Sequence, residues 1–273
     1  MQTSRSPLRH FPTLAPYAAA LLLAGAMLHA PLASAADLLA TVKARGTVKV
    51  ALEGTYPPFN YKEQKGGELA GFDVDVARLL AAKLGVKTEF VTSEWASILA
   101  GLAAGKYDVI VSQVTVNPKR EQAFDFSVPY EYSMPQLVVR KDEKAQYNTL
   151  QDLKGKRVGV GQGSVYEMQA KAVPGIEVRS YPAAPENLRD LAVGRVDAAL
   201  NDSLMTAYLL KTSDLPIKAG AKVGKVERVA AAFKKGNPQF KAAIDKALAE
   251  AAADGSLAAI SVKWFGVDVT RAP

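Results

Sequence analysis

Beyond residue 36, hydrophobic residues alternate between the short runs typical of buried strands and the wider spacing typical of helices. The β-branched run Val48–Leu52 predicts a strand. Asp73–Leu84 has apolar positions at helical spacing, with Asp73 as a plausible N-cap and Gly85 as a plausible stop. The elements predicted next are a strand over Thr88–Thr92, a helix over Trp95–Ala104 ended by Gly105, and a strand over Tyr107–Val114. This β-α-β-α-β order predicts a parallel, doubly wound sheet.

The same order recurs in the second half of the chain. Its predicted elements are a turn-rich approach at Leu150–Lys156, a strand over Arg157–Val160, a helix beginning at Ser164, a strand near Val178, a helix near Glu186–Ala192 and a strand over Ala198–Leu200. Pro238–Ala253 then predicts an alanine-rich helix ended by Gly255. Two units of similar size indicate an α/β protein with two lobes. Between the lobes we expect short strand-like hinges, near Glu131–Pro135 and Val226–Val229.

The first 35 residues have the three parts of a secretory signal. Arg5 and Arg9 give a positive start, Ala18–Leu28 is apolar apart from Gly25, and Ala33-Ser34-Ala35 is a small-x-small cleavage motif. A membrane anchor is the alternative, but the apolar run is about half of the roughly 20 residues that a spanning helix needs. The sequence has no cysteine, which excludes lipid attachment at the cleavage site. We therefore expect removal after Ala35 and a soluble, exported product.

Charge and composition narrow the possible functions. The chain has 34 basic and 27 acidic residues, a net charge of +7; without the two signal arginines this becomes 32 minus 27, or +5. No Lys/Arg block occurs, so nucleic acid is not an expected partner. Both histidines, His10 and His29, lie in the predicted signal. The exported part therefore has neither His nor Cys, which excludes a His-based triad, a Cys nucleophile and a typical zinc site. No metal or cofactor is predicted.

A series of motifs in order carries a family resemblance. They are Leu52–Phe59, Gly71–Asp75, Leu102 with Gly105–Asp108, Thr115–Arg120, Phe126–Tyr130, Asp152–Val160, Gly194–Ala198 and Lys263–Gly266. Together they resemble the periplasmic polar-amino-acid-binding proteins of ABC importers, extracellular solute-binding protein family 3. Within that family, three segments are most similar in sequence to the L-cystine-binding branch: Glu53–Tyr56, Gln113–Thr115 and Trp264–Thr270.

The resemblance implies a type II periplasmic-binding-protein fold. Each lobe is expected to be a doubly wound, mostly parallel sheet, and two short hinge strands are expected to join the lobes. The implied division is a signal peptide at 1–35, a first part of lobe 1 at 36–133, lobe 2 at 134–227 and a return segment of lobe 1 at 228–273.

Two charged residues are the expected clamp for an amino acid. Arg120 follows the third strand of lobe 1, at the sheet edge where such folds bind ligands, and a guanidinium grips a carboxylate bidentately. Asp202 follows a strand of lobe 2, and the resemblance assigns it the ligand's α-ammonium group. The alternatives are a surface pair of Arg120 with Glu121 or Asp125, and a helix cap at Asp202.

The other expected site residues surround the ligand. Backbone N–H groups of Ser164 and Val165, at a predicted helix start, are expected to take the carboxylate, with Thr115 opposite. By resemblance, Tyr56 and Trp95 are aromatic walls, and Glu53, Gln113 and Tyr166 set specificity. Core packing is the alternative for Trp95, a surface position for Tyr166, and a simple turn for the glycines before Ser164.

The predicted function is delivery of an amino acid to the permease and ATPase subunits of an ABC importer, from the periplasm and as a monomer. L-cystine is favoured, but Glu53 would equally suit arginine or lysine, and cysteine or glutamine are further alternatives. Two functions of another class compete. One is a periplasmic enzyme of the cyclohexadienyl dehydratase kind with Glu53 as general acid, and the other is a sensory module. We do not expect an enzyme, because the amino-acid clamp is intact.

Overall fold

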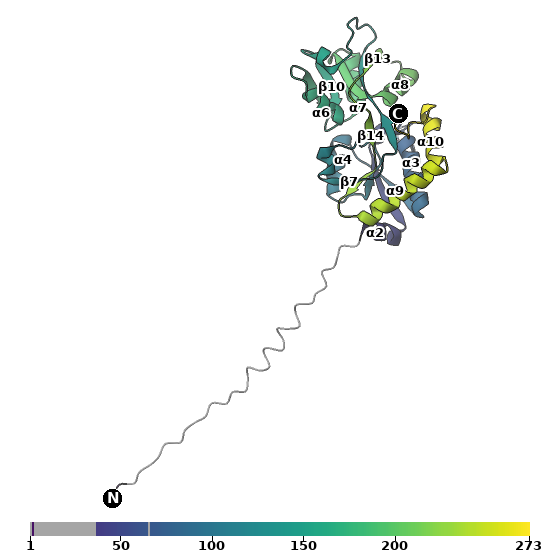
Figure 1. Ribbon diagram of the computed structural model, residues 1–273. Helices are drawn as coiled ribbons and strands as arrows, with labels where there is room; N and C mark the ends of the chain where they lie inside the picture. The colour runs from purple at the N-terminus through teal and green to yellow at the C-terminus, as the bar shows by residue number, and fades with distance from the viewer. Residues whose placement is uncertain (1, 3–36, 65) are drawn as a thin grey trace. The chain divides into compact units, whose positions relative to one another are not determined.

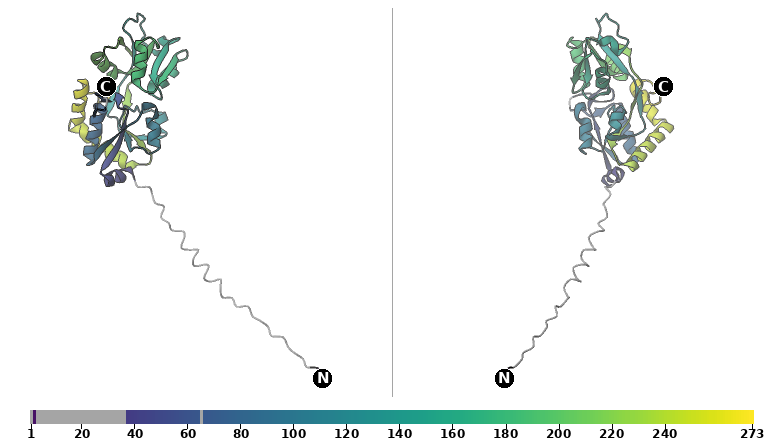
Figure 2. Two further views of the ribbon diagram at one scale, coloured as in Figure 1. Left: turned by 180° about the vertical axis from the view of Figure 1, so that it is seen from behind. Right: turned by 60° about the vertical axis from the view of Figure 1, so that its left-hand side comes forward.

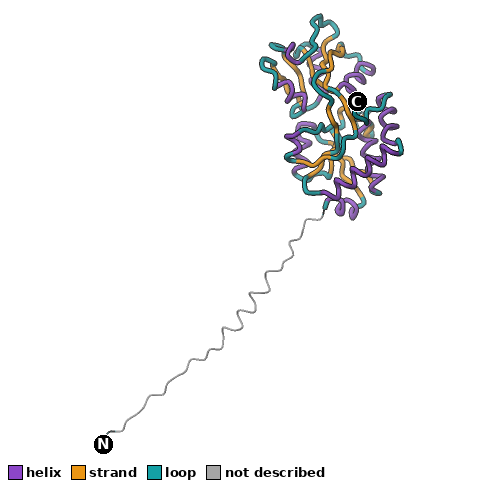
Figure 3. Tube along the Cα trace, in the orientation of Figure 1, coloured by secondary structure: helices purple, strands orange, loops and turns teal. Residues whose placement is uncertain are grey.

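The computed structural model describes residue 2, residues 37–64 and residues 66–273, so the predicted signal peptide lies outside the described residues apart from Gln2. Residues 37–273 form one compact unit. Within it, strands lie inside two lobes and helices cover them (Figures 1 and 3). Among the described residues, the structure contains no helix whose length and apolar character would let it cross a membrane.

The sheet of lobe 1 has five strands. Their order is β5 (Lys87–Thr92), β1 (Thr47–Leu52), β6 (Val109–Ile110), β15 (Ala232–Lys234) and β7 (Phe124–Phe126). Because β15 is antiparallel to both neighbours while β1 is parallel to β5 and β6, four strands share one direction and β15 opposes them. The helices of this lobe are α2 (Leu38–Arg45), α3 (Phe72–Leu84), α4 (Trp95–Ala103), α5 (Pro118–Glu121), α9 (Pro238–Ala253) and α10 (Ser256–Phe265).

The sheet of lobe 2 has the same plan. Its order is β11 (Glu177–Tyr181), β10 (Arg157–Gly161), β12 (Ala198–Asp202), β9 (Pro135–Arg140) and β13 (Ile217–Lys222), and β9 is the reversed strand. The helices are α6 (Val165–Lys171), α7 (Ala184–Ala192) and α8 (Ser203–Thr212), with a 3₁₀ turn η1 (Leu150–Leu153). These two sheets are the mostly parallel, doubly wound sheets that the sequence predicts.

Two short strands connect the sheets. β8 (Glu131–Ser133) leads into β9, and β14 (Glu227–Val229) leads into β15. β8 and β14 pair with each other antiparallel. The reversed strand of each sheet is therefore the one that the chain enters directly from a connecting strand. These connecting strands lie where the hinges are expected.

Apolar side chains at the predicted spacings form the core of each lobe. In lobe 1, Val50 of β1, Leu80 of α3 and Phe233 of β15 belong to one buried cluster with residues of α9, and α3 packs on both α9 and α10. α9 and α10 run along one flank of this lobe, in yellow in Figure 2. In lobe 2, Leu137 and Val160 belong to a separate buried cluster.

The helix over Pro238–Ala253 is confirmed, and so is its end at Gly255, whereas two local predictions are wrong. Gly71, not Asp73, is the N-cap of α3: its φ is 129°, and a Cβ there would lie 2.2 Å from the Phe59 carbonyl oxygen. Asp254 is the C-cap of α9, and Gly255 follows it in the left-handed conformation, with a φ of 79°, that stops the helix; Gly255 is also the N-cap of α10.

The strand predicted over Tyr107–Val114 is confined to β6, Val109–Ile110. Three residues beyond it, Gln113 has a φ of 53°, which is incompatible with an extended ladder. A small antiparallel sheet of β2 (Thr55–Tyr56), β3 (Asn60–Lys62) and β4 (Leu69–Ala70) was not predicted.

Candidate functional site

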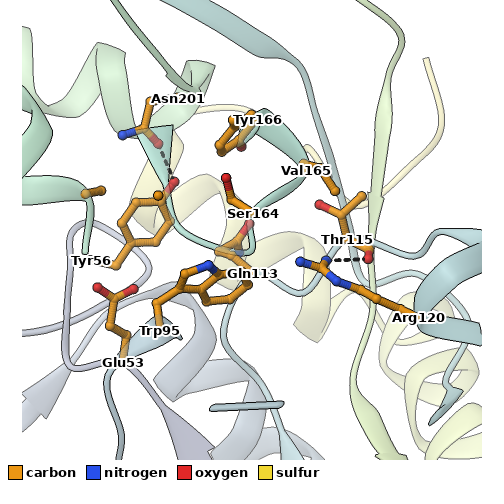
Figure 4. Close-up of a pocket in the computed structure, with 12 residues that line it drawn as sticks. Glu53, Tyr56, Trp95, Gln113, Thr115, Arg120, Ser164, Val165, Tyr166 and Asn201 are labelled. Atoms are coloured by element: carbon orange, nitrogen blue, oxygen red, sulfur yellow. Dashed lines mark hydrogen bonds between the residues drawn. The ribbon is translucent and has the colours of Figure 1, made fainter. Parts of the chain in front are cut away.

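A pocket lies between the two lobes, at the carboxyl ends of the parallel strands (Figure 4). Its volume is about 40 Å³. The residues that line it are Glu53, Tyr56, Trp95, Gln113, Thr115 and Arg120 from lobe 1, and Gly161, Ser164, Val165, Tyr166, Ala184 and Asn201 from lobe 2. Nine of the ten residues predicted from the sequence are in this set, and Asp202 is not.

Arg120 is a buried cation that contacts both lobes. It lies in α5, where the Asn117 side chain accepts the Arg120 backbone N–H at 2.9 Å. Its Nη1 donates to the Thr115 carbonyl at 2.7 Å and its Nη2 to the Gly163 carbonyl at 3.1 Å. Burial lowers the pKa of Arg120 to about 10, so the group is cationic at neutral pH. Among the described residues Arg120 forms no ion pair with an acidic side chain, so the expected alternative, a surface pair, is not what the structure has.

Two aromatic side chains form walls of the pocket. Tyr56 is buried, and its hydroxyl donates across the lobes to Asn201 Oδ1 at 2.7 Å. Trp95 begins α4, and its ring lies 5.5 Å from the Arg120 guanidinium carbon. Trp95 also packs against the lobe 1 core. Both alternatives for Trp95 are thus true at once: one side belongs to the core and the other to the pocket.

Glu53 is a buried carboxyl group at the end of β1. Its Oε1 accepts a hydrogen bond from the Thr55 hydroxyl at 3.0 Å, and its backbone N–H donates to Ser112 Oγ at 3.1 Å. Burial raises the pKa of Glu53 to about 7, since desolvation outweighs the hydrogen bond from Thr55; the charge of Glu186 raises it further. Glu53 therefore shifts between neutral and charged forms near neutral pH.

A buried polar network fixes Gln113 beneath the pocket. Asp73 Oδ1 accepts from Gln113 Nε2 at 3.0 Å and from the Tyr130 hydroxyl at 2.9 Å, and Asp73 Oδ2 accepts from Asn60 Nδ2 at 2.8 Å. Asn60 Oδ1 in turn accepts the Gly54 N–H at 2.8 Å. Burial raises the pKa of Asp73 to about 6 despite these donors. The network ties the segment after β1 to the turn that carries Gln113.

Lobe 2 offers the start of α6 to the pocket. Ser164 is the N-cap, and its Oγ accepts the Glu167 N–H at 3.1 Å. The Ser164 N–H donates to the Gly161 carbonyl at 3.1 Å, so it is engaged in the turn, contrary to its expected role as a donor to ligand. Val165 is the first residue of the helix, where an N–H has no intrahelical acceptor.

Asp202 lies behind the pocket wall. Its Oδ1 caps α8 by accepting the N–H groups of Leu204 at 2.7 Å and Met205 at 3.2 Å. Its Oδ2 lies 3.5 Å from the Tyr166 hydroxyl, and burial raises the pKa of Asp202. The helix-cap alternative is therefore realised. The surface alternative for Tyr166 is wrong, because Tyr166 lies over Asp202 and lines the pocket.

Three lining residues were not predicted: Gly161, Ala184 and Asn201. Asn201 had a detectable signal, since it is a polar residue that directly extends the buried run Ala198–Leu200. Gly161 presents only its backbone to the pocket and Ala184 only a methyl group. Neither residue type indicates a binding role, so the sequence alone does not identify them.

A wider groove adjoins the pocket next to Glu53. The volume of the groove is about 620 Å³. It is lined by Gly54, Thr55 and Pro185, which lie next to the pocket residues Glu53 and Ala184 in the chain. Two cations, Lys62 and Arg189, border it, one from each lobe. Among the described residues, no set of three or more acidic, His or Cys side chains is arranged to hold a metal ion.

Comparisons with known proteins point in one direction. Residues 48–267 match the family described as bacterial extracellular solute-binding proteins, family 3. The chain is 41% identical to the L-cystine-binding protein TcyJ of Escherichia coli K12 over 86% of this chain and 88% of that one. It is 35% identical to the L-cystine-binding protein TcyA of Bacillus subtilis, over 86% and 87%.

Solved structures give the same fold. An ancestral arginine-binding protein bound to arginine has a TM-score of 0.77 and 38% identity, covering 81% of this chain and 99% of that one. An ancestral amino-acid-binding protein, AncCDT-1, a precursor of cyclohexadienyl dehydratase, has a TM-score of 0.77 and 33% identity, covering 83% and 99%.

Proposed function

Because the chain belongs to family 3 of the bacterial extracellular solute-binding proteins, we propose that it binds a polar amino acid between its lobes and delivers it to an ABC importer. The partners are then the permease and ATPase subunits of that importer. The site of action is the periplasm, reached through the predicted signal peptide. The protein acts as a monomer in this proposal.

The observation that carries the proposal is the buried Arg120. Its two guanidinium nitrogens are held by backbone carbonyls, one from each lobe, and a ligand carboxylate is a better partner for both. A cavity of about 40 Å³ has room for a few water molecules and not for an amino acid. Ligand entry therefore requires the lobes to separate, and rotation about β8 and β14 is the simplest such motion.

Asp202 supplies the opposite charge in this proposal. Its Oδ2 faces Tyr166, which covers it from the pocket side. A small displacement of the Tyr166 ring would bring the Asp202 carboxylate to the ligand's α-ammonium group. Arg120 belongs to lobe 1 and Asp202 to lobe 2, so the two charges grip one zwitterion only when the lobes close.

L-cystine is the ligand that the site favours. The two relatives named as L-cystine-binding proteins support this choice. Glu53 can accept hydrogen bonds from a second ammonium group, and the adjoining groove gives the distal half of a long ligand room beside Lys62 and Arg189. Gln113 and Tyr166 complete the specificity set. Arginine or lysine is the alternative, because one distal cation would also satisfy Glu53, and cysteine or glutamine binding by the same mechanism is the next.

A second function rests on two observations. Glu53 has a pKa of about 7, which suits a general acid, and a precursor of a dehydratase has this fold. An enzyme of the cyclohexadienyl dehydratase kind would use Glu53 to protonate a leaving hydroxyl group. The amino-acid clamp favours binding over this activity.

Isothermal titration of ligand-stripped protein with cystine, cysteine, arginine, lysine, histidine and glutamine tests the proposal. Micromolar or tighter binding of cystine supports it, with weaker binding of the rest. Preference for arginine or lysine would keep the transport role and change the ligand. Binding of none of these amino acids, together with turnover of prephenate or arogenate, would replace transport by catalysis.

A further inference from the structure

A buried glutamate lies in the connection between the lobes. Glu131 begins β8, opposite Val229 of β14, and its side chain is fully buried. Neither of its carboxyl oxygens has a hydrogen-bond partner among the described residues. Burial strips water from this carboxyl group. The neighbouring Ser133 and Gln113 side chains approach it without forming a well-oriented hydrogen bond, so the charged form in particular is destabilised.

Two more buried carboxyl groups lie near Glu131, one from each lobe. Burial is the main cause that raises the pKa of Glu131 well above its usual range, and the charges of Asp202 and Asp73 raise it further. In the part of the chain that the structure describes, no lysine or arginine forms an ion pair with any of these three groups. Three carboxyl groups therefore lie near one another at the centre of the closed protein, and no basic side chain of the described residues is paired with them.

The remaining groups around Glu131 do not supply a positive charge. Tyr56 from β2, Tyr130 just before β8 and Tyr166 from α6 all have their pKa raised by burial first and by nearby carboxylates that include Glu131. On β14, Glu227 accepts a hydrogen bond from Gln169 and faces Arg120, while Arg228 is exposed. The side chains around Glu131 are therefore hydroxyls, the amide of Gln113 and other acids.

We propose that Glu131 is a second partner, with Asp202, for the α-ammonium group of the ligand, and that it releases a proton to solvent as that group arrives. The proposal rests on the proposed function, because it needs a ligand with an ammonium group. Before binding, Glu131 is a neutral carboxylic acid among other acids. The ammonium brings the missing positive charge, so the O–H bond of Glu131 ionises, its proton passes to water, and the carboxylate remains opposite the ammonium.

The proposal fixes the direction in which ligand affinity depends on pH. Ligand binding lowers the pKa of Glu131 from its raised value, so protons are released on binding. Affinity then increases with pH until the pH exceeds the raised pKa, and below that it falls by up to about tenfold per pH unit. Glu53 and Asp73 also have raised pKa values, so their contributions have to be separated from that of Glu131.

Titration calorimetry in two buffers of different ionisation enthalpy tests the proposal, with L-cystine and L-arginine as probes near neutral pH. We expect the wild-type protein to release about half to one proton per ligand through Glu131. The Glu131→Gln variant loses this release and binds with a flatter pH profile. The Glu63→Gln variant, which changes an exposed glutamate outside the pocket, is the matched control and keeps it.

Infrared difference spectra provide a second measurement that needs no change at Glu131. Ligand addition to the wild type and to Glu53→Gln should remove a protonated-carboxyl band. Binding without proton release, or release that Glu131→Gln leaves unchanged, overturns the proposal for Glu131 while the transport function stands. Failure of both probes and of every other amino acid to bind overturns the transport function, and this inference with it.

Discussion

Lobe 1 and lobe 2 share one strand order, with the reversed strand in the same place, yet they offer different groups to the pocket. Both charged residues that line the pocket, Glu53 and Arg120, come from lobe 1. Lobe 2 contributes the start of α6, one amide and one phenol, and holds its carboxylate, Asp202, behind the wall.

The difference extends to how each lobe holds its site. In lobe 1, a buried network around Asp73 fixes Gln113 and the segment of Glu53, whereas in lobe 2 the site residues are helix caps. A side chain held by several buried hydrogen bonds keeps its position when the lobes separate. We therefore expect lobe 1 to distinguish ligands and lobe 2 to complete the closed form. The following changes test that division.

The largest effect is expected for Arg120→Ala in lobe 1. Removal of a buried charge partner from a ligand carboxylate costs about 4 kcal/mol, a roughly thousandfold loss of affinity. Lys119→Ala, one residue away and exposed, is the matched control and should bind normally. Calorimetry measures both; similar affinities for the two variants would remove Arg120 from the site.

Glu53→Gln is expected to change the pH dependence of stability. Burial holds the folded-state pKa of Glu53 at about 7 against 4.5 in the unfolded chain. The stabilisation is therefore complete below about pH 4.5 and is lost as the pH rises through about 7, by about 3 kcal/mol in total. The variant should lose less stability than the wild type between about pH 5 and about pH 8. Thermal unfolding of the ligand-free proteins measures this, with Glu63→Gln on the exposed hairpin as control; parallel profiles would contradict it.

In lobe 2, Asp202→Asn separates charge from capping. Asparagine caps a helix as well as aspartate does, so stability should hold while affinity falls by about 2 kcal/mol, roughly thirtyfold. Asp202→Ala should show the same loss of affinity and also lose about 1 kcal/mol of stability. Calorimetry and urea unfolding distinguish the two. Normal affinity in Asp202→Asn would leave Asp202 as a cap alone.

The smallest effect is expected where the lobes meet. Tyr56 and Asn201 form one hydrogen bond across the pocket, which contributes about 1 kcal/mol to closure. Tyr56→Phe, Asn201→Ala and the double variant form a cycle that isolates this term. Affinity for the ligand should fall by about fivefold in each single variant, with little further loss in the double. Additive losses would mean that the two side chains act separately.

The sequence predicted the fold where periodicity and caps agreed. α9 was predicted at its observed bounds, and Gly85 ends α3 as expected. The prediction for Asp73 was wrong, because an aspartate two residues after an obligatory glycine has the same local sequence pattern as an N-cap. Only its tertiary contacts with Asn60, Gln113 and Tyr130 show that Asp73 is buried inside the helix start. Nothing in the local sequence pattern distinguishes an aspartate that caps a helix from one that is buried in its first turn.

The site was predicted mainly from family motifs, and the structure adds what the motifs omit. The motifs place Asp202 in the clamp, but in the structure its side chain caps α8 and lies behind the pocket wall. Glu131 carried no signal, since a glutamate in a polar hinge segment is ordinarily exposed, and its burial depends on how β8 pairs with β14. Features of this kind arise from long-range pairing, which a local pattern does not contain.

The position of β15 has a consequence for the order of synthesis. β15 lies between β6 and β7, so a strand made near the end of translation completes the interior of a sheet begun near residue 47. Until Ala232–Lys234 has been made, the first lobe is two separate fragments with an open seam between them. Contacts that span so much of the chain form slowly. A chain with this topology can therefore complete its first lobe only after nearly all of its residues have been synthesised, which favours folding after translation over folding during it.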